Sequence, residues 1–247
     1  MIAVVSPIAY WTAVGFGAVL CLSLCLAARR RPGRWRIVVA RAIGSALAAD
    51  IVAYTVGLIV ARTWTAETSL PLALCNAGVV VAAIACWWRV PLLVELTYFL
   101  GLAGTLQAVL TPDLSVNFPH LVFFEYVVGH VGIVLAALFL VVGLRLRPRP
   151  GAVPRVFAIT AAYTAFVGLV DGVTGANYMF LRRPPGEWTV LRLLGPWPWY
   201  VVSAAGVALV LLVLLDLPFR RGRAGPGRAD TGSADPAGSR RRVPAAG

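Results

Sequence analysis

The chain has 247 residues, of which 60% are apolar, and a formal net charge of +12 in which arginine supplies all the positive charge, because lysine is absent. In a soluble domain this surplus of positive charge would indicate nucleic-acid binding. Here the arginines lie between long apolar runs and in the C-terminal tail, so they indicate membrane topology and argue against a nucleic-acid partner.

Seven apolar runs reach or approach the ~20 residues that a helix needs to cross ~30 Å of hydrocarbon. The breaks between them carry turn or charge chemistry, such as RRRPGRWR after the first run and RLRPRPGAVPR after the fifth. We therefore predict an all-α fold, a polytopic membrane bundle of seven transmembrane helices. The predicted spans are 8–28, 37–60, 70–88, 90–111, 119–144, 155–178 and 196–217.

The arginines also predict the orientation of the bundle, because loops on the cytoplasmic side of a membrane are enriched in positive charge. With the N-terminus outside, the arginine-rich loops after the first and fifth spans and all tail arginines fall inside. Only four arginines then lie outside: Arg62, Arg182, Arg183 and Arg192. We predict a multi-pass protein of the cell membrane, with its N-terminus outside and its C-terminus in the cytoplasm.

Two regions differ in composition. Residues 1–218 form the predicted transmembrane domain, whereas residues 219–247 are rich in Gly, Pro, Ala, Arg and Ser. Such a segment buries too little apolar surface to offset the entropy of ordering it, so we predict a disordered cytoplasmic tail. Its arginines either attract anionic lipid headgroups, at roughly 1 kcal/mol each near the surface, or serve as a solvated topology anchor.

Several polar side chains lie within the predicted spans, where an ionisable group costs on the order of 2.5–3.5 kcal/mol at mid-bilayer. Counting residues from the span ends places most of them in the outer half of the bilayer, whereas Glu95 belongs to the inner half. This shared depth predicts a polar cavity that opens to the outer face. The alternative is that the same groups hydrogen-bond between helices, at about 0.6 kcal/mol each. The outer-half residues are Cys75, Gln107, Glu125, His130, Asp171 and Asn177, followed directly by Tyr178.

Cys75 differs from the other three cysteines, which lie among apolar neighbours and are expected to pack in the core. Its predicted depth is similar to that of His130, the histidine that lies inside a span. A cysteine and a histidine on different helices suit nucleophilic acyl transfer, because the imidazole can take the thiol proton and return it to the leaving group. Two side chains at similar depth need not face each other, so structural roles for both stay open. The sequence has no paired ligand motif, and we predict neither a metal nor a cofactor.

Five segments match a known family in order and spacing over roughly residues 35–218. They are LPLALC at 70–75, FLGLAGTLQAVLTPD at 99–113, FPHLVFFEYVVGH at 118–130, GANYMFLRRPP at 175–185 and GPWPWY at 195–200. Together they resemble the bacterial YwaF-like integral membrane proteins, to which vertebrate transmembrane protein 164 is related. That relative is described as a phospholipid acyltransferase using a cysteine and a histidine, so the resemblance implies Cys75 as nucleophile and His130 as base. The chain departs from the family pattern at Ala73, where a polar residue often stands.

Three hypotheses of function follow. In the first, the protein is a cysteine-dependent acyltransferase or acyl hydrolase that acts on lipid acyl chains from the outer leaflet. Gln107, Asp171 and Asn177 would then orient His130 or stabilise an oxyanion, although Asp171 serves equally well as a buried hydrogen-bond partner. In the second, the same groups, with Glu125 and Tyr178, bind or transport a small amphiphile without chemistry. In the third, the protein is a scaffold without a pocket. Membrane lipids are the expected partners.

Overall fold

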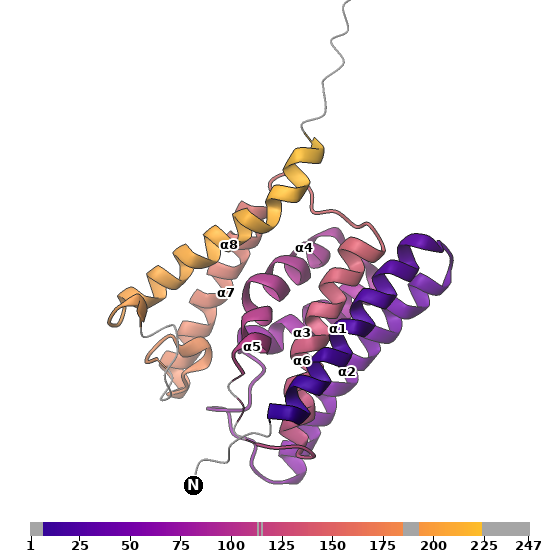
Figure 1. The fold of residues 1–247 in the computed structure, drawn as a ribbon. Coiled ribbons are helices and arrows are strands. Elements are labelled where there is room, and N and C mark those ends of the chain that lie inside the picture. The colour runs from indigo at the N-terminus through magenta and orange to yellow at the C-terminus, as the bar shows by residue number, and fades with distance from the viewer. Residues whose placement is uncertain (1–6, 113, 115, 185–192, 224–247) are drawn as a thin grey trace, which may run out of the picture.

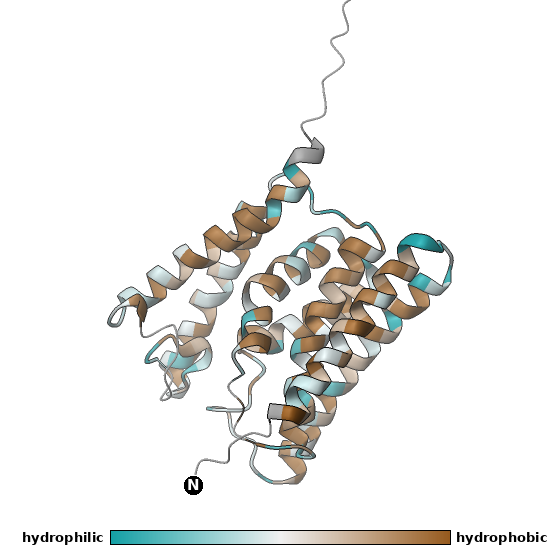
Figure 2. Cartoon of the chain, in the orientation of Figure 1, coloured by the Kyte–Doolittle hydropathy of each residue, from teal (hydrophilic) through white to brown (hydrophobic). Residues whose placement is uncertain are grey.

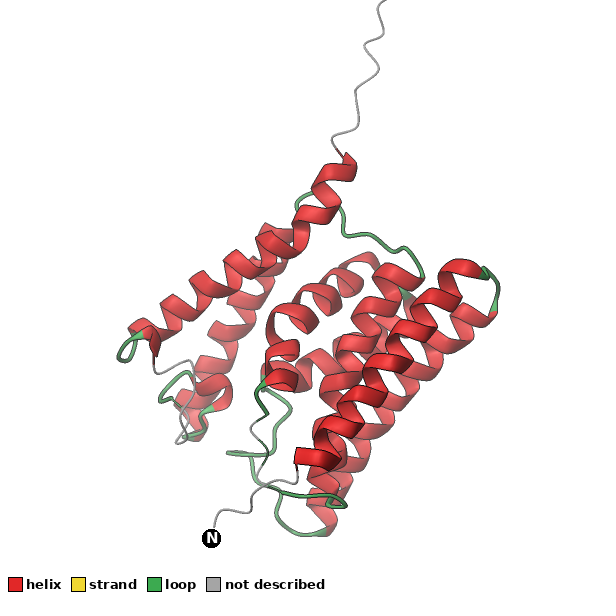
Figure 3. Ribbon diagram, viewed as in Figure 1, coloured by secondary structure: helices red, strands yellow, loops and turns green. Residues whose placement is uncertain are grey.

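The computed structural model describes residues 7–112, 114, 116–184 and 193–223, and within them every regular element is helical (Figure 3). The all-α prediction is therefore confirmed. The elements are α1 (Pro7–Arg30), α2 (Trp35–Val60), α3 (Leu74–Trp88), α4 (Pro91–Leu100), the π-helical turn η1 (Gly101–Thr105), α5 (Leu106–Leu110), α6 (Leu121–Leu138), the π-helical turn η2 (Phe139–Gly143), α7 (Ala152–Thr174), the 3-10 turn η3 (Tyr178–Phe180) and α8 (Trp199–Arg223).

Within the described residues, 6 continuous helical segments of 20 to 26 residues are long and apolar enough to cross a membrane. Two of them are composite, because η1 joins α4 to α5 and η2 extends α6 without a break. The remaining predicted span, the third, corresponds to α3, which has 15 residues and is only about 22 Å long. The prediction of a polytopic helical membrane bundle is confirmed.

The third span was expected to begin at residue 70, but α3 begins only at Leu74. Pro71 lacks a backbone N–H, and Ala73 has an extended conformation with φ −58° and ψ 143°. The chain therefore reaches the start of α3 as a non-helical segment. Such backbone is stable at membrane depth only where protein groups satisfy its polar atoms.

Two tyrosines from the α7 region satisfy this segment. The Tyr178 hydroxyl accepts a hydrogen bond from Leu70 N at 2.8 Å. The Tyr163 hydroxyl donates to Leu72 O at 3.0 Å. The stretch that leads into α3 is therefore anchored to a helix from a distant part of the sequence.

The sixth predicted span, 155–178, is displaced in the structure, where α7 covers Ala152–Thr174. Gly175 ends the helix with φ +80°, in the left-handed region that glycine adopts without strain. Asn177 and Tyr178 therefore lie beyond the helix, in the turn that η3 forms.

The last helix, α8, continues through Phe219, the predicted start of the tail, and ends at Arg223. The rest of the predicted tail, residues 224–247, lies outside the described residues. The disorder expected there, and the contact of its arginines with anionic lipids, remain predictions.

The helices form three groups across the bundle (Figure 1): α1 and α2 lie on one side, α3 to α6 lie in the middle, and α7 pairs with α8 on the other side. The start of α1 and the end of α8 lie at opposite ends, as an odd number of crossings requires. We call the end with the α1–α2 turn and the loop 145–151 the inner end, following the predicted orientation, and the opposite end the outer end. The orientation itself stays a prediction from the arginine distribution.

The surface of the helices is largely apolar (Figure 2). On α7, Phe166, Leu169 and Val173 are 53%, 72% and 89% exposed and recur at helical spacing. A stripe of this kind is unfavourable in water and is what contact with lipid requires. The main core lies in the middle group, where side chains such as Phe99 and Ile133 are fully buried.

Close packing of α2 on α3 depends on Gly44, where an added Cβ would lie 2.8 Å from Ala83 O and 2.9 Å from Cys86 Cβ. We expect Gly44→Ala to destabilise the protein by about 1–3 kcal/mol, because the backbones must move apart. The change should appear as a lower thermal unfolding temperature of the purified protein in detergent. Gly15→Ala is the control, because a Cβ there meets nothing within 4 Å. Equal unfolding temperatures for the two variants would contradict this packing.

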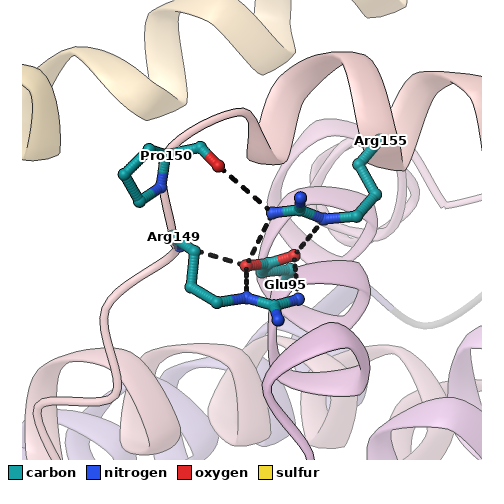
Figure 4. Close-up of polar contacts among 4 residues, drawn as sticks. All are labelled: Glu95, Arg149, Pro150 and Arg155. Atoms are coloured by element: carbon teal, nitrogen blue, oxygen red, sulfur yellow. Dashed lines mark hydrogen bonds and ion pairs between the residues drawn. The ribbon is translucent and has the colours of Figure 1, made fainter.

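At the inner end, Glu95 of α4 is 1% exposed and is held by two arginines (Figure 4). Arg149 donates to Oε1 from Nε at 2.8 Å and from its backbone N–H at 3.0 Å. Arg155 Nε donates to Oε2 at 3.0 Å. The hydrogen bond to the carboxylate raises the pKa of the Arg149 guanidinium, because it stabilises the cation. This group, the Glu95 clamp, fastens the loop between η2 and α7 to the start of α4.

Candidate functional site

The site is built where α3, η1 and α6 meet around Ile133. A Cβ added to Gly78 of α3 would lie 3.4 Å from Ile133 Cδ1, and one added to Gly101 of η1 would lie 3.0 Å from Ile133 Cγ2. The two glycines therefore let three backbones approach one branched side chain. We call this contact the Ile133 junction; it sets the relative heights of the three segments.

Cys75, Thr105 and His130 all lie one helical turn from the Ile133 junction, on its outer side. Each stands three or four residues from the junction residue of its own segment, and residues at this spacing share a helix face. Because α3 and α6 run in one direction and the α4–η1–α5 segment runs in the other, all three steps lead toward the outer end. The three side chains therefore stand at one level, about 5 Å from the junction.

The Cys75 thiol is free and half-buried at the start of α3. The Thr105 hydroxyl lies within hydrogen-bonding reach of it, and the Glu125 carboxylate is close enough to act on it electrostatically. Thr105 is 4% exposed and ends the π-helical turn η1. Turns of this kind occur frequently at functional sites, because they redirect a side chain without ending the helix.

His130 is held by the residue one turn before it on α6. Its Nδ1 lies 2.7 Å from Tyr126 O, and its ring stacks on the Tyr126 ring with a centroid distance of 4.1 Å. A carbonyl oxygen only accepts, so Nδ1 donates, and the neutral ring carries its free lone pair on Nε2. Tyr126 in turn donates its hydroxyl to Ala108 O at 2.9 Å. Within the described residues, Cys75 and His130 share no hydrogen bond.

Two carboxylates, Asp50 of α2 and Glu125 of α6, lie close to each other near the site. Asp50 Oδ2 lies 3.5 Å from the position that a Cβ on Gly129 would take, one turn from Glu125 on α6. The Asp50 and Glu125 carboxylates act on each other electrostatically, and Glu125 also acts electrostatically on the Tyr54 hydroxyl. Neither carboxylate has an ion pair in the described part of the chain. No group of three or more His, Cys, Asp or Glu side chains among the described residues could hold a metal ion.

A cleft of about 450 Å³ separates α7 and α8 from α3, α4 and η1. Its lining is mostly aliphatic, and its volume is within the range of ~300–1,000 Å³ typical of small-molecule pockets. Leu74 and Gly104 form part of its wall, and Leu74 Cδ2 lies 3.9 Å from the position of a Cβ on Gly104. These two are the direct chain neighbours of Cys75 and Thr105. Cys75 and Thr105 themselves are not among the residues that line the cleft, so the thiol lies one residue from its wall.

Asp171 is fully buried, and its carboxylate accepts a hydrogen bond from a residue close to it in sequence. Its Oδ1 accepts from Tyr178 N at 2.9 Å, and its Oδ2 has no hydrogen-bond partner among the described residues. This contact orients Tyr178, whose hydroxyl donates to Ala66 O at 3.0 Å and accepts from Leu70 N at 2.8 Å. Asp171 therefore stabilises the turn after α7 and, through Tyr178, the segment that leads into α3.

Asn177 and Gln107 also bond to their own surroundings. Asn177 Oδ1 accepts from Arg182 N at 2.9 Å and from Arg183 N at 3.2 Å. Gln107 is exposed, and its Nε2 donates to Ala103 O at 3.0 Å within its own helical segment. The hydrogen bonds of both side chains therefore stabilise their own turn or helix end.

Two of the predicted residues, Glu125 and His130, lie at a height along the bundle close to that of the Cys75 thiol. The structure places the others at helix ends and outer turns: Gln107, Asp171, Asn177 and Tyr178. Three side chains of this region were not predicted from the sequence: Tyr54, Thr105 and Tyr126. The four-residue spacing between Tyr126 and His130 was a signal that they share a helix face. The π-helical turn that directs Thr105 has no such signal.

Tyr178→Phe should lower stability by about 2 kcal/mol, because it leaves Leu70 N and Ala66 O without partners, at ~1 kcal/mol per hydrogen bond. It should also raise the rate at which a maleimide labels Cys75, because the segment leading into α3 loosens. Thermal unfolding and labelling kinetics measure the two effects. Tyr163→Phe, which removes one hydrogen bond to the same segment, should give about half the loss of stability. Unchanged stability and labelling in Tyr178→Phe would contradict this anchoring role.

The lipid-facing helices, with polar groups enclosed among them, define a polytopic helical membrane protein. The TMEM164 family model matches residues 3–216, most of the chain, and the chain belongs to this family. Neither curated proteins nor solved structures give a match. Membership confirms the relation to transmembrane protein 164 that the sequence motifs indicated, and the closer relation to bacterial YwaF-like proteins remains a prediction.

Proposed function

We propose that the protein is a membrane-embedded acyl-transfer enzyme, in which Cys75 takes an acyl chain from a lipid ester and passes it to a second hydroxyl group or to water. One observation carries the proposal: the wall of the apolar cleft includes Leu74 and Gly104, directly beside Cys75 and Thr105. A lipid chain in the cleft would bring its carbonyl carbon to the thiol. In the predicted orientation, the chain enters from the outer leaflet of the cell membrane.

His130 supplies the base in this mechanism. Its Nε2 takes the thiol proton, the thiolate adds to the acyl carbonyl carbon to form a tetrahedral intermediate, and the ester carbon–oxygen bond breaks when this intermediate collapses. The proton then passes from Nε2 to the leaving oxygen, so the products are a free hydroxyl on the donor lipid and a thioester on Cys75. In the second step Nε2 takes a proton from the acceptor hydroxyl or water, that oxygen attacks the thioester, and the proton returns to the Cys75 sulfur.

The tetrahedral intermediate carries a negative charge on the former carbonyl oxygen, which needs a hydrogen-bond donor close to the thiol. The Thr105 hydroxyl is the donor within reach of Cys75. Gln107 and Asn177, which sequence analysis favoured for this task, already bond to their own turns. We therefore assign the oxyanion contact to Thr105.

A second candidate function is the binding or transport of a small amphiphile without chemistry. Two observations favour it: the Asp50–Glu125 pair lacks an ion-pair partner among the described residues, and Cys75 does not hydrogen-bond to His130 there. In this function the two carboxylates contact the polar head of the amphiphile, and the apolar cleft takes its chain.

The test is to reconstitute the purified protein in liposomes that contain a phospholipid with an alkyne-tagged acyl chain. Acyl transfer requires a label on Cys75 that survives denaturation, is released by hydroxylamine and is found on the Cys75 peptide by mass spectrometry. A tagged lipid that copurifies and is lost on denaturation would support the second function. Absence of both kinds of label would contradict both functions.

A further inference from the structure

The apolar cleft is open along α8 because that helix presents alanines to it. Ala204, Ala205 and Ala208 line the cleft on this side, and Ala161 lines it on the α7 side. Small side chains on facing helices leave room between them for a hydrocarbon chain, whereas protein interiors are in general close-packed. The wall from Ala204 to Leu212 is roughly 12 Å long.

Leu212 lies at the inner end of the apolar cleft. Its side chain is 3% exposed and belongs to the main core, and Phe157 of α7 and Leu100 of α4 line the same end. One turn further inward, the Tyr98 hydroxyl donates to Leu215 O at 3.2 Å and ties α4 to α8. The apolar cleft is therefore closed at its inner end, and the Leu212 side chain, which belongs to the core, fixes the position of that end.

We propose that Leu212 sets the maximum length of the acyl chain that the protein accepts. This inference rests on the proposed function, because it places the carbonyl end of the chain at Cys75. From the wall formed by Leu74 and Gly104, a chain bound at the thiol extends inward along the alanines of α8 until its methyl end meets Leu212. A shorter chain leaves apolar wall uncovered, and a longer chain meets a packed side chain.

The test measures chain-length preference from the acyl adduct that forms on the full-length protein in liposomes. The donors are equal amounts of octanoyl, lauroyl, palmitoyl and stearoyl p-nitrophenyl esters, and intact mass reports the adducts. Leu212→Ala should raise the ratio of long to short adducts roughly tenfold, and Ala208→Phe, which fills the apolar cleft earlier, should lower it by a similar factor. Val207→Ala and Val210→Phe are matched controls, because these residues of α8 are 47% and 58% exposed and should keep the original ratio.

A second readout separates this inference from the proposed function. In a Cys75→Ala background, palmitic acid with a diazirine at its methyl end should cross-link to the α8 peptide around Leu212. One outcome is that the wild type forms no thioester, but the cross-link near Leu212 forms and Ala208→Phe abolishes it. This outcome would refute acyl transfer and would support the length limit as a property of binding. A thioester whose chain-length ratio is the same in all four variants would overturn the length limit and leave the proposed function intact.

Discussion

Replacing Cys75 by alanine or serine should abolish acyl transfer, with a loss of rate of at least on the order of a thousandfold. In the proposed mechanism the thiolate forms the covalent bond to the acyl carbon. A serine hydroxyl at the same place is a much weaker nucleophile near neutral pH, because it is far harder to deprotonate. The hydroxylamine-sensitive label and the release of deacylated lipid from liposomes measure the loss. His130→Asn should reduce the rate less, by roughly a hundredfold, because the nucleophile remains and only its base is removed.

Cys86→Ala is the matched control for this experiment. Cys86 lies on the same helix as Cys75 but is fully buried near the inner end of α3. The variant therefore removes one thiol from α3 without touching the cleft, and gel filtration and thermal unfolding verify that it folds. Equal transfer by Cys75→Ala and Cys86→Ala would contradict the assignment of the nucleophile. Retained binding of tagged lipid by Cys75→Ala, with no covalent label in the wild type, would favour the amphiphile binder.

Hydropathy was sufficient to predict the bundle, because the thickness of the hydrocarbon layer sets the length that an apolar helix must have. It could not locate every helix end. The third span extends apolar residues through Leu70 and Leu72, but Pro71 delays α3, and the lost helical hydrogen bonds are replaced by tyrosines from the α7 region. At the end of the sixth span the apolar residues continue past Thr174 through Tyr178 to Leu181, and the left-handed Gly175 marks where α7 stops.

The height of the candidate residues along their helices could be estimated from the sequence, but the direction of each side chain around its helix could not. Counting from the span ends placed Cys75 and His130 at a similar depth, and the Ile133 junction puts them at one level. The direction of Thr105 depends on the π-helical turn η1, whose sequence GLAGT contains no residue that requires such a turn. The tautomer of His130 depends on a backbone carbonyl, which sequence patterns do not indicate.

The hydrogen-bond partners of the buried carboxylates were the other part that could not be predicted from the sequence. Asp171 was equally compatible with a role beside His130 and with a buried hydrogen bond, and the structure shows the bond to Tyr178 N, seven residues along the chain. Glu95 had no partner that could be recognised by spacing. Its arginines lie 54 and 60 residues away in sequence, and only the return of the chain through η2 brings them to α4.

Replacing Glu95 by alanine should have a large effect on stability, about 3 kcal/mol. The substitution leaves the Arg149 and Arg155 guanidinium groups next to each other without the anion between them. Both arginine side chains are partly exposed, at 48% and 34%, so they can regain water. This exposure keeps the loss near the lower limit of the ~3–5 kcal/mol that breaking a buried ion pair costs. The thermal unfolding temperature in detergent, followed by tryptophan fluorescence, measures the effect.

Further variants separate the charge of the Glu95 clamp from its shape. Glu95→Gln keeps the shape but turns one acceptor into an NH₂ donor that faces guanidinium donors, so its unfolding temperature should fall nearly as far as that of Glu95→Ala. Arg149→Ala and Arg155→Ala each leave one cation on the carboxylate, whereas the double variant leaves a buried charge unpaired and should be less stable than the two single losses added together. Arg147→Ala is the control, because this arginine lies in the same loop with an exposed side chain. An unfolding temperature of Glu95→Ala equal to that of Arg147→Ala would mean that packing alone holds the loop on α4.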